Sequence, residues 1–407
     1  MVKVIYAHHD GSITGSAISL RNLLAALDRK AFSPRVALFS DGPARRMYEE
    51  LHIPVDVVTA QPFWTFPGST WTELSFYINF LALLPNNSWK QYLIDHQPDI
   101  LHVNDKSCLQ AGATAGKLGI PVIWHLRSSY YPSKSKWHAA ISARVIRKNA
   151  NRLIAISEDE TDGFQHSDRL NIIYNSVDLS VADEAMLLRE KKRAELGLSS
   201  KDILIGQVST TINEVRGTWD FLHACGLIGR KIGNLSLRYM IVAGIPERKK
   251  NSPRYLFTGK SVHPEDQVWQ IAKEENITDR LTLTGFRKDV VNLMAAMDVV
   301  VVCNRHGVLG RMPFEAMSLG RPLVVTAGHS GQSRIVIDQE TALVVPPATP
   351  AGIADAVCNI LMDQSLAQAI SNRGLTYARQ HFDPLKNARL VEKVYRDLLK
   401  ERGGNAE

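Results

Sequence analysis

Short runs of β-branched and other apolar residues alternate along this chain with longer amphipathic segments. In the first half the runs are VKVIYAHH, RVALFS, DILHVND, PVIWHLR and RLIAIS, each followed by a segment with helical spacing. The alternation restarts with ILIGQVS and continues through LRYMIVAG, LTLTGF, VVVVCN, PLVVTAG and ALVVPP. Parallel strands joined by crossover helices give this pattern. We therefore predict an α/β protein with two Rossmann-like, doubly wound domains, whose strands end around a shared crevice.

The domain boundaries follow from where the alternation pauses. We expect an N-terminal domain over residues 1–178 and a C-terminal domain over residues 179–383, because the charged helical stretch EAMLLREKKRAELGL separates the two runs of strands. Residues 384–407 should form a last helix from Pro384 to about Lys400, followed by a frayed polar tail. A length of 407 residues agrees with two domains of ordinary size.

Charge and cysteine content narrow the class of partner and of site. The formal net charge of +7 favours an anionic partner, which could be a nucleoside diphosphate, a lipid headgroup or a nucleic acid. No recognisable nucleic-acid module accompanies that charge, so we expect no nucleic-acid binding. The four cysteines lie far apart and form no CxxC pair, which argues against a disulfide framework and against a zinc cluster. We expect a cytoplasmic protein with no metal, no leader and no membrane-spanning helix.

The first turn after a strand, HHDGSITGSAISL, contains neither a G-x-G-x-x-G nor a Walker-type motif. The backbone amides of Gly15 and Ser16 at a helix start could face a phosphate. The alternative is a tight turn in which Ser16 is the N-cap. Of the two histidines before this turn, we expect one of His8 and His9 in the core and the other toward the crevice.

The stretch NRHGVLGRMPFEAMSLGRP, residues 304–322, reads as a strand end, a glycine-hinged loop and a short helix. Pro313 suits the first helical turn, Gly320 suits the helix end, and Gly310 lets the loop approach a ligand. Glu315 then projects from the first turn, near free N–H groups. It is either a capping carboxylate or an acceptor for the hydroxyls of a ribose whose phosphates lie at the helix N-terminus.

GVLGRMPFEAMSLGRPLVV resembles the nucleotide-sugar loop of the retaining glycosyltransferases of family 4, the glycosyl transferases group 1 type, which have the GT-B fold of two Rossmann-like domains facing a central cleft. The resemblance continues, in order, through DILHVND, PVIWHLR, IIYNSVD, LTLTGFRKDVVNLMAAMDVVVV and ALVVPP. It implies transfer of a sugar from a nucleoside-diphosphate sugar, such as a UDP- or GDP-sugar, with retention of configuration and without a metal. The implied acceptor is a glycan or a lipid-linked molecule, as in surface polysaccharide or glycolipid synthesis, and no separate cofactor is expected.

The same resemblance assigns roles around the donor. Glu315 matches the family glutamate that binds the ribose, while the glutamate seven residues earlier, which contacts the donor sugar, is replaced here by Gly307. Gln207 stands where the family has a phosphate-binding arginine, and Arg216 stands where it has a lysine. Arg216 would neutralise the diphosphate in bidentate fashion. Glu315, Arg216 and His125 form the implied catalytic set.

The resemblance also describes His125, Gly285 and Phe286, and Arg311 is a further candidate. His125, at the end of PVIWHLR, matches a histidine that contacts the donor sugar or the acceptor, and the alternative is a structural histidine. Gly285 and Phe286 resemble the loop that cradles the base, largely through backbone. Arg311 either adds to the phosphate grip or is a solvated surface arginine.

Aromatic and basic residues gather in the N-terminal half. The aromatic stretch contains Trp64, Phe66, Trp71, Phe76 and Tyr77, and KSKWHAAISARVIRKNANR places basic residues around Trp137. We expect peripheral docking on the inner face of an anionic membrane, or else a core helix with a solvated basic face.

Three functions stay open at this point. The first is an active retaining glycosyltransferase. The second is a GT-B protein that binds nucleotide or glycan without turnover, which the residues Gly307 and Gln207 make credible. The third is a sugar-nucleotide epimerase or phosphorylase of the same fold, against which the order of the motifs argues.

Overall fold

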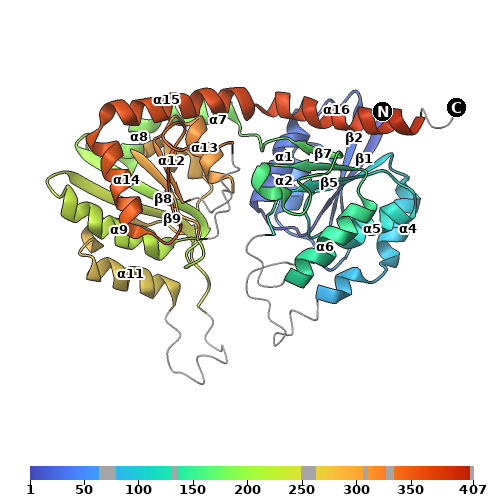
Figure 1. The fold of residues 1–407 in the computed structure, drawn as a ribbon, viewed down its shortest axis with the longest axis horizontal. Coiled ribbons are helices and arrows are strands. Elements are labelled where there is room, and N and C mark those ends of the chain that lie inside the picture. The colour runs from blue at the N-terminus through green and yellow to red at the C-terminus, as the bar shows by residue number, and fades with distance from the viewer. Residues whose placement is uncertain (64–78, 131–135, 249–262, 306–309, 327–333, 404–407) are drawn as a thin grey trace, which may run out of the picture. The chain divides into compact units, whose positions relative to one another are not determined.

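The structure is a computed structural model that describes residues 1–63, 79–130, 136–248, 263–305, 310–326 and 334–403. The chain divides into two compact units, Met1–Ser176 with His381–Glu407, and Val177–Gln380. Each unit contains one parallel sheet flanked by helices (Figure 1). The predicted α/β class with two Rossmann-like sheets is confirmed.

The first unit has a seven-stranded sheet in the order β3-β2-β1-β4-β5-β6-β7. The five predicted strands are present, and the structure adds two strands of three residues each at the edges, β3 and β7. The strands are β1 Val2–His8, β2 Phe32–Leu38, β3 Val55–Val57, β4 Ile100–Val103, β5 Val122–Leu126, β6 Arg152–Ala155 and β7 Leu170–Ile172.

Helices cover both faces of this sheet. They are α1 Gly15–Ala26, α2 Ala44–Glu49, α4 Asn87–His96, α5 Leu109–Lys117, α6 Lys136–Asn149 and α16 Pro384–Gly403, with short 3-10 turns η1 Asn79–Leu83 and η2 Glu158–Thr161. Successive residues of β5 point to opposite faces. Ile123 packs in the core formed with α1 and α16, and Trp124 packs in the core formed with α5 and α6.

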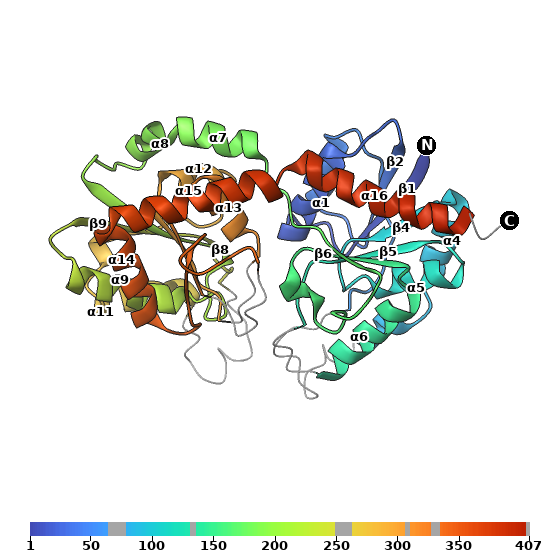
Figure 2. The ribbon, with the colours of Figure 1, turned by 45° about the horizontal axis from the view of Figure 1, so that its top comes forward.

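The C-terminal helix α16 belongs to the first unit. It lies beside α1 in both views (Figure 1 and Figure 2). Its Tyr395 hydroxyl lies 2.7 Å from Nδ1 of His102, and Nδ2 of Asn387 donates to the carbonyl of Tyr174 at 2.9 Å. The helix therefore completes the face of the first sheet, although residues 384–407 had been expected as a separate segment.

The second unit has a six-stranded sheet in the order β10-β9-β8-β11-β12-β13. Its strands are β8 Asp202–Thr211, β9 Ser236–Gly244, β10 Leu281–Leu283, β11 Val299–Val302, β12 Leu323–Thr326 and β13 Leu343–Val345. Its helices are α7 Leu179–Leu187, α8 Arg189–Glu195, α9 Thr218–Lys231, α11 Pro264–Glu274, α12 Val290–Ala296, α13 Met312–Ser318, α14 Pro350–Met362 and α15 Gln364–His381, with a 3-10 turn η3 Thr278–Arg280. In each unit the strand order reverses once, between β1 and β4 and between β8 and β11, and ligands of open α/β sheets bind outside such reversals.

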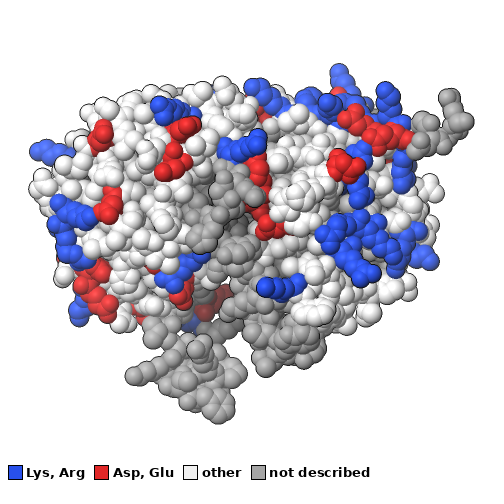
Figure 3. Space-filling model, viewed as in Figure 1, with Lys and Arg blue, Asp and Glu red and all other residues white. Residues whose placement is uncertain are grey.

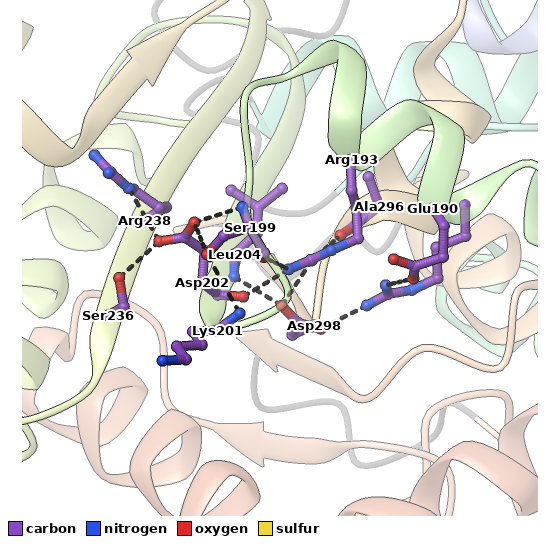
Figure 4. A network of polar contacts seen from close by, with 11 residues as sticks. Glu190, Arg193, Ser199, Lys201, Asp202, Leu204, Ser236, Arg238, Ala296 and Asp298 are labelled. Atoms are coloured by element: carbon purple, nitrogen blue, oxygen red, sulfur yellow. Dashed lines mark hydrogen bonds and ion pairs between the residues drawn. The ribbon is translucent and has the colours of Figure 1, made fainter.

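A polar network fastens α8 to the amino ends of β8 and β11 (Figure 4). The Arg193 guanidinium is buried and donates to Asp298 Oδ2 at 3.0 Å, to the Ala296 carbonyl at 2.8 Å and to the Asp202 carbonyl at 2.6 Å. Asp298 Oδ2 also accepts the N–H of Leu204 at 2.8 Å. This network lies at the amino ends of β8 and β11, away from their carboxyl ends where ligands of such sheets bind, and is structural.

Among the helices that the structure describes, none combines the length and the apolar character that crossing a bilayer requires.

Candidate functional site

The strand reversal of the second unit is where its predicted site residues gather. The loop after β8 carries Arg216, and the chain after β11 passes through Asn304 to α13. Arg216 Nη1 donates to Asn304 Oδ1 at 3.4 Å, and the Arg216 backbone N–H donates to Asn213 Oδ1 at 2.8 Å. Burial lowers the pKa of Arg216, but an arginine stays charged at physiological pH even so. The structure therefore holds one cation at the carboxyl end of β8.

Glu315 and Arg311 form an ion pair within the first turn of α13. Arg311 Nη2 lies 3.2 Å from Glu315 Oε1, and only 8% and 10% of the two side chains are exposed. The interpretation of Arg311 as a solvated surface residue is therefore wrong. Among the described residues, the hydrogen-bond partner of the Glu315 carboxylate is thus a guanidinium and not a backbone N–H of the helix start. The contact of Glu315 with a ribose stays a prediction.

The helix that carries Glu315 has the predicted frame. Pro313 lies in the first turn, and Gly310 and Gly320 on either side of the helix have φ values of 62° and 58°. Residues 306–309, which include Gly307, lie outside the described residues.

Gln207 lies inside β8 and is fully buried. Its Nε2 donates to the carbonyl of Arg216 at 2.9 Å. Gln207 thus supports the backbone of the loop that carries Arg216. A direct contact between Gln207 and a phosphate stays a prediction, and this geometry disfavours it.

An ion pair between loops was not predicted. Arg305 donates to both carboxylate oxygens of Asp220, each at 2.8 Å, and contacts Glu214 as well. It joins the chain after β11 to the start of α9. The residues are 85 positions apart, so no local pattern could reveal the pair.

The loop after β10 carries Gly285 and Phe286. Gly285 has a φ of 71°, and 67% of Phe286 is exposed. Two strands, β9 and β8, separate β10 from β11 in the sheet. The structure thus leaves this ring open to a ligand without joining it to Glu315 through any described contact.

In the first unit, α1 begins at Gly15, as predicted for the phosphate-facing or tight turn. The N-cap is Thr14, whose Oγ1 accepts the N–H of Ala17 at 3.3 Å. Ser16 lies inside the first turn, with its hydroxyl 2.9 Å from that of Thr14. The interpretation of Ser16 as the N-cap is therefore wrong, because the helix starts one residue before it.

His125 lies near the end of β5 and is 3% exposed. Its Nδ1 lies 3.1 Å from Nε2 of His102 and 3.3 Å from Nη2 of Arg127. It lines a small cavity together with residues of α1 and α16. The described contacts therefore place His125 within a buried polar chain, and its role toward a substrate stays a prediction.

His8 and His9 are both buried, contrary to the expectation that one of them faces the crevice. Together with Asp10, they form the one group among the described residues whose ligand atoms lie within 4.8 Å of one another, as a metal site would need.

Comparison with known proteins gives the family and the fold. Residues 204–363 match the family Glycosyl transferases group 1, and residues 13–181 match Glycosyltransferase Family 4. The chain is 26% identical over 138 residues to the lipopolysaccharide core biosynthesis glycosyltransferase LpsD of Rhizobium meliloti, covering 34% of this chain and 38% of that protein. It is 21% identical over 232 residues to the N-acetyl-alpha-D-glucosaminyl L-malate synthase of Bacillus anthracis, covering 57% and 55% of the two chains. These alignments thus span less than two thirds of either relative.

Among solved structures, HepE of Anabaena in complex with UDP and glucose superposes with a TM-score of 0.76. The match covers 97% of this chain and all of that one at 20% identity, which shows a shared fold.

The two sheets and the matching structure define a GT-B protein. The chain belongs to the glycosyltransferases of group 1, family 4, because the two family matches together span most of its length.

Proposed function

We propose that this chain transfers a sugar from a nucleoside-diphosphate sugar to a glycan or lipid-linked acceptor, with retention of the anomeric configuration. The observation that carries the proposal is the arrangement at the β8–β11 reversal. There the cation Arg216 and the buried Glu315–Arg311 pair follow neighbouring strands. The relatives point the same way, since one is a lipopolysaccharide core glycosyltransferase and the HepE complex holds UDP.

The proposed chemistry asks for a place where negative charge can develop. When the bond between sugar and diphosphate breaks, the departing diphosphate gains charge, and preorganised cations stabilise it. Arg216 is held by Asn304 and Asn213, so little reorganisation is needed at that moment. We assign Arg216 to the diphosphate and Glu315 to the ribose hydroxyls.

The number of candidate carboxylates bears on how the anomeric configuration would be retained. A double displacement would need a second carboxylate about 5 Å from the first, as in retaining hydrolases. No sequence motif supplies such a pair. We therefore propose a front-face displacement, in which the departing phosphate oxygen takes the proton of the acceptor hydroxyl, without a metal and without a protein nucleophile.

The direct test replaces Glu315 by glutamine. Glu315→Gln keeps the size of the side chain and removes the charge that meets Arg311. We expect sugar transfer to fall by about 100-fold or more, equivalent to roughly 2.7 kcal/mol, together with weaker binding of the nucleoside diphosphate. An assay of product formation measures the rate of sugar transfer, and isothermal titration calorimetry measures the binding of the nucleoside diphosphate.

The matched control is Glu195→Gln. Glu195 also pairs with a basic side chain, Lys192, but is half exposed on α8. We expect its activity to stay near wild type. Transfer by Glu315→Gln at the wild-type rate would contradict the assignment.

A second function is favoured by one observation. Gln207 is neutral, fully buried and hydrogen-bonded to the carbonyl of Arg216, so it adds no positive charge to the proposed diphosphate site. A GT-B protein that binds nucleotide or glycan without turnover would fit a site with this smaller positive charge. In that case Glu315→Gln would weaken nucleotide binding, and no acceptor would yield product.

The first unit carries a basic helix face. Lys and Arg side chains gather over the part of the first unit where α5 and α6 lie (Figure 3). On α6 the exposed residues Trp137, Arg144 and Lys148 recur at helical spacing, and the helix contains no acidic residue. We propose that this face docks on an anionic membrane that presents a lipid-linked acceptor.

Liposome flotation tests the docking face. Salt-sensitive binding to anionic vesicles, weakened by Trp137→Ala, would support it. Equal recovery with neutral and anionic vesicles would remove it.

A further inference from the structure

Three histidines lie buried at the carboxyl ends of adjacent strands in the first unit. His8 ends β1, His102 lies in β4 and His125 lies near the end of β5, and their exposure is 0%, 0% and 3%. The strands β1, β4 and β5 are neighbours, and β1 and β4 flank the strand reversal. Burial, reinforced by the positive charge of Arg127, lowers the pKa of all three well below the usual range, so each is neutral near pH 7. A neutral imidazole carries one ring proton, and its neighbours decide on which nitrogen.

Arg127 fixes the proton of His125. Its guanidinium donates from Nε to Asn104 Oδ1 at 2.8 Å and from Nη1 to Asn175 Oδ1 at 2.8 Å, while Nη2 lies 3.3 Å from His125 Nδ1. A guanidinium has no acceptor. His125 Nδ1 must therefore accept, and the ring proton of neutral His125 lies on Nε2.

Arg127 also sets the tautomer of His8, through the side-chain amide of Asn104. Because Asn104 Oδ1 accepts from Arg127, the amide nitrogen of Asn104 is the atom that faces His8, at 3.0 Å from Nδ1. That nitrogen can only donate. His8 Nδ1 therefore accepts, and neutral His8 also carries its proton on Nε2.

The tautomer of His102 follows from that of His125. Its Nε2 lies 3.1 Å from the accepting Nδ1 of His125, so His102 donates from Nε2 into a three-centre bond shared with Arg127. His102 Nδ1 then accepts from the hydroxyl of Tyr395 at 2.7 Å. The hydroxyl oxygens of Tyr395 and Tyr6 lie 3.1 Å apart. One direction of donation thus runs from Tyr395 on α16 through His102 to His125.

Two ring N–H groups are not used in this chain of hydrogen bonds. Nε2 of His8 and Nε2 of His125 are buried and have no hydrogen-bond partner among the described residues. Native proteins pair nearly all such groups with protein, water or ligand. The cavity that His125 lines together with Ser19, Asn175 and Asn387 has a volume of about 20 Å³, which is room for one water.

The tautomers also decide against a metal at His8, His9 and Asp10. A metal ligand must offer a lone pair. His8 Nδ1 is occupied by the Asn104 amide, and His8 Nε2 carries the proton. The proximity of these three side chains is therefore not a sufficient reason for a cation to bind.

We infer that Arg127 is a positioning residue, which sets the tautomers of His8 and His125 so that both carry their ring proton on Nε2, and that the Nε2–H of His125 donates to a water in the adjoining cavity. The tautomer assignment is independent of the proposed transferase function. Its kinetic consequence rests on that function.

Histidine tautomers are visible directly by NMR. In protein labelled with nitrogen-15 at histidine, long-range proton–nitrogen correlation spectra distinguish the two neutral forms, and the variants His8→Gln and His125→Gln assign the signals. We expect the Nε2–H form for both residues, unchanged between about pH 6 and pH 8. The charged and titratable neighbours are Arg127 and His9 for His8, and Arg127 and His102 for His125. A proton on Nδ1 of either residue, a titration within that range, or stoichiometric zinc binding that shifts the His8 signals would overturn the inference.

The variant Arg127→Lys tests whether Arg127 sets the tautomer of His125. Lysine keeps the charge but has one nitrogen, which cannot meet all three acceptors. We expect His125 to lose its single tautomer and kcat to fall at least about tenfold, whereas Arg169→Lys, on an arginine that is 44% exposed in the same unit, should change neither. An unchanged His125 signal in Arg127→Lys would overturn the role of Arg127. Correct tautomers in a protein that turns over no nucleotide sugar would instead contradict the proposed function and leave the assignment standing.

Discussion

The charge of Glu315 is compensated within its own helix, because Arg311 lies four residues before it and both side chains are buried. A buried pair of this kind is costly to break, since the partner left behind has no water to solvate it.

Gly217 constrains the loop that carries Arg216, because it has a φ of 66° at the start of α9. A Cβ on Gly217 would lie 2.6 Å from Cβ of Cys303, the residue after β11.

Gly217→Ala therefore combines backbone strain with a clash. We expect a loss of roughly 3 kcal/mol in the free energy of unfolding, measured by urea denaturation. Gly197→Ala is the matched control, since Gly197 has a φ of 69° and open space around its missing Cβ. It should cost about 1 kcal/mol. Equal losses in the two variants would show that the contact with Cys303 does not constrain the loop.

At the scale of elements, α8 is held by its arginine more than by its length. The helix spans seven residues, and its Arg193 reaches both β8 and β11. The sequence had suggested one helical stretch, whereas the structure has α7 and α8 separated at Leu188. Short helices depend on tertiary contacts of this kind, because they are marginal by themselves.

Arg193→Met removes the buried guanidinium that donates to Asp298 and to the carbonyls of Ala296 and Asp202, although Asp298 keeps its second partner, Arg189. We expect a loss of about 3 kcal/mol in unfolding free energy. Arg238→Met removes a half-exposed arginine of the same network, 3.5 Å from Asp202, and should cost less than about 1 kcal/mol. Urea denaturation at one pH measures both. A cost for Arg193→Met as small as that of Arg238→Met would make the network incidental to stability.

The elements that could be predicted are those with a local pattern. The eleven predicted strands and the frame of α13 were visible, because the alternation of strand-like and helix-like segments, Pro313 and Gly320 are local signals. Contacts between distant residues were not. Tyr395 meets His102 across 293 positions, and the donation chain through Arg127 depends on strand neighbours that only the folded sheet supplies. Thr14 could have been recognised as the N-cap, but Ser16 satisfies the same rule two residues later.

At the scale of the whole molecule, each unit has its own core and places its candidate residues at its own strand reversal. The two regions differ in electrostatics. The first unit keeps three histidines neutral by burial, while the second unit holds Asp202 with a pKa below the usual range, because Ser236 and Ser199 donate to its carboxylate. The units should therefore respond to acid in different ranges of pH.

Below the ordinary histidine pKa of 6.5, the unfolded chain takes up protons that the folded first unit does not. Stability is therefore present above that pH and is lost as the pH falls. Glu160 opposes the loss, because burial raises its pKa and the folded state retains its proton. We expect a net slope of about 2.7 kcal/mol per pH unit near pH 5.5, for about two protons. Asp202 adds a further loss below its ordinary pKa of 3.8, in the second unit.

Denaturation between pH 5 and 8 measures this slope, and His102→Gln should lower it by about one proton. A flat profile would show that the three histidines titrate normally and are not buried as described.

The most direct measurement is thermal stabilisation by a panel of UDP-, GDP- and ADP-sugars beside the bare diphosphates, in the wild type and in Glu315→Gln. A ligand that binds the native state raises the melting temperature. We predict a larger shift from one nucleotide sugar than from its diphosphate, and loss of that shift in Glu315→Gln. No shift from any compound in the panel would contradict the proposed donor site.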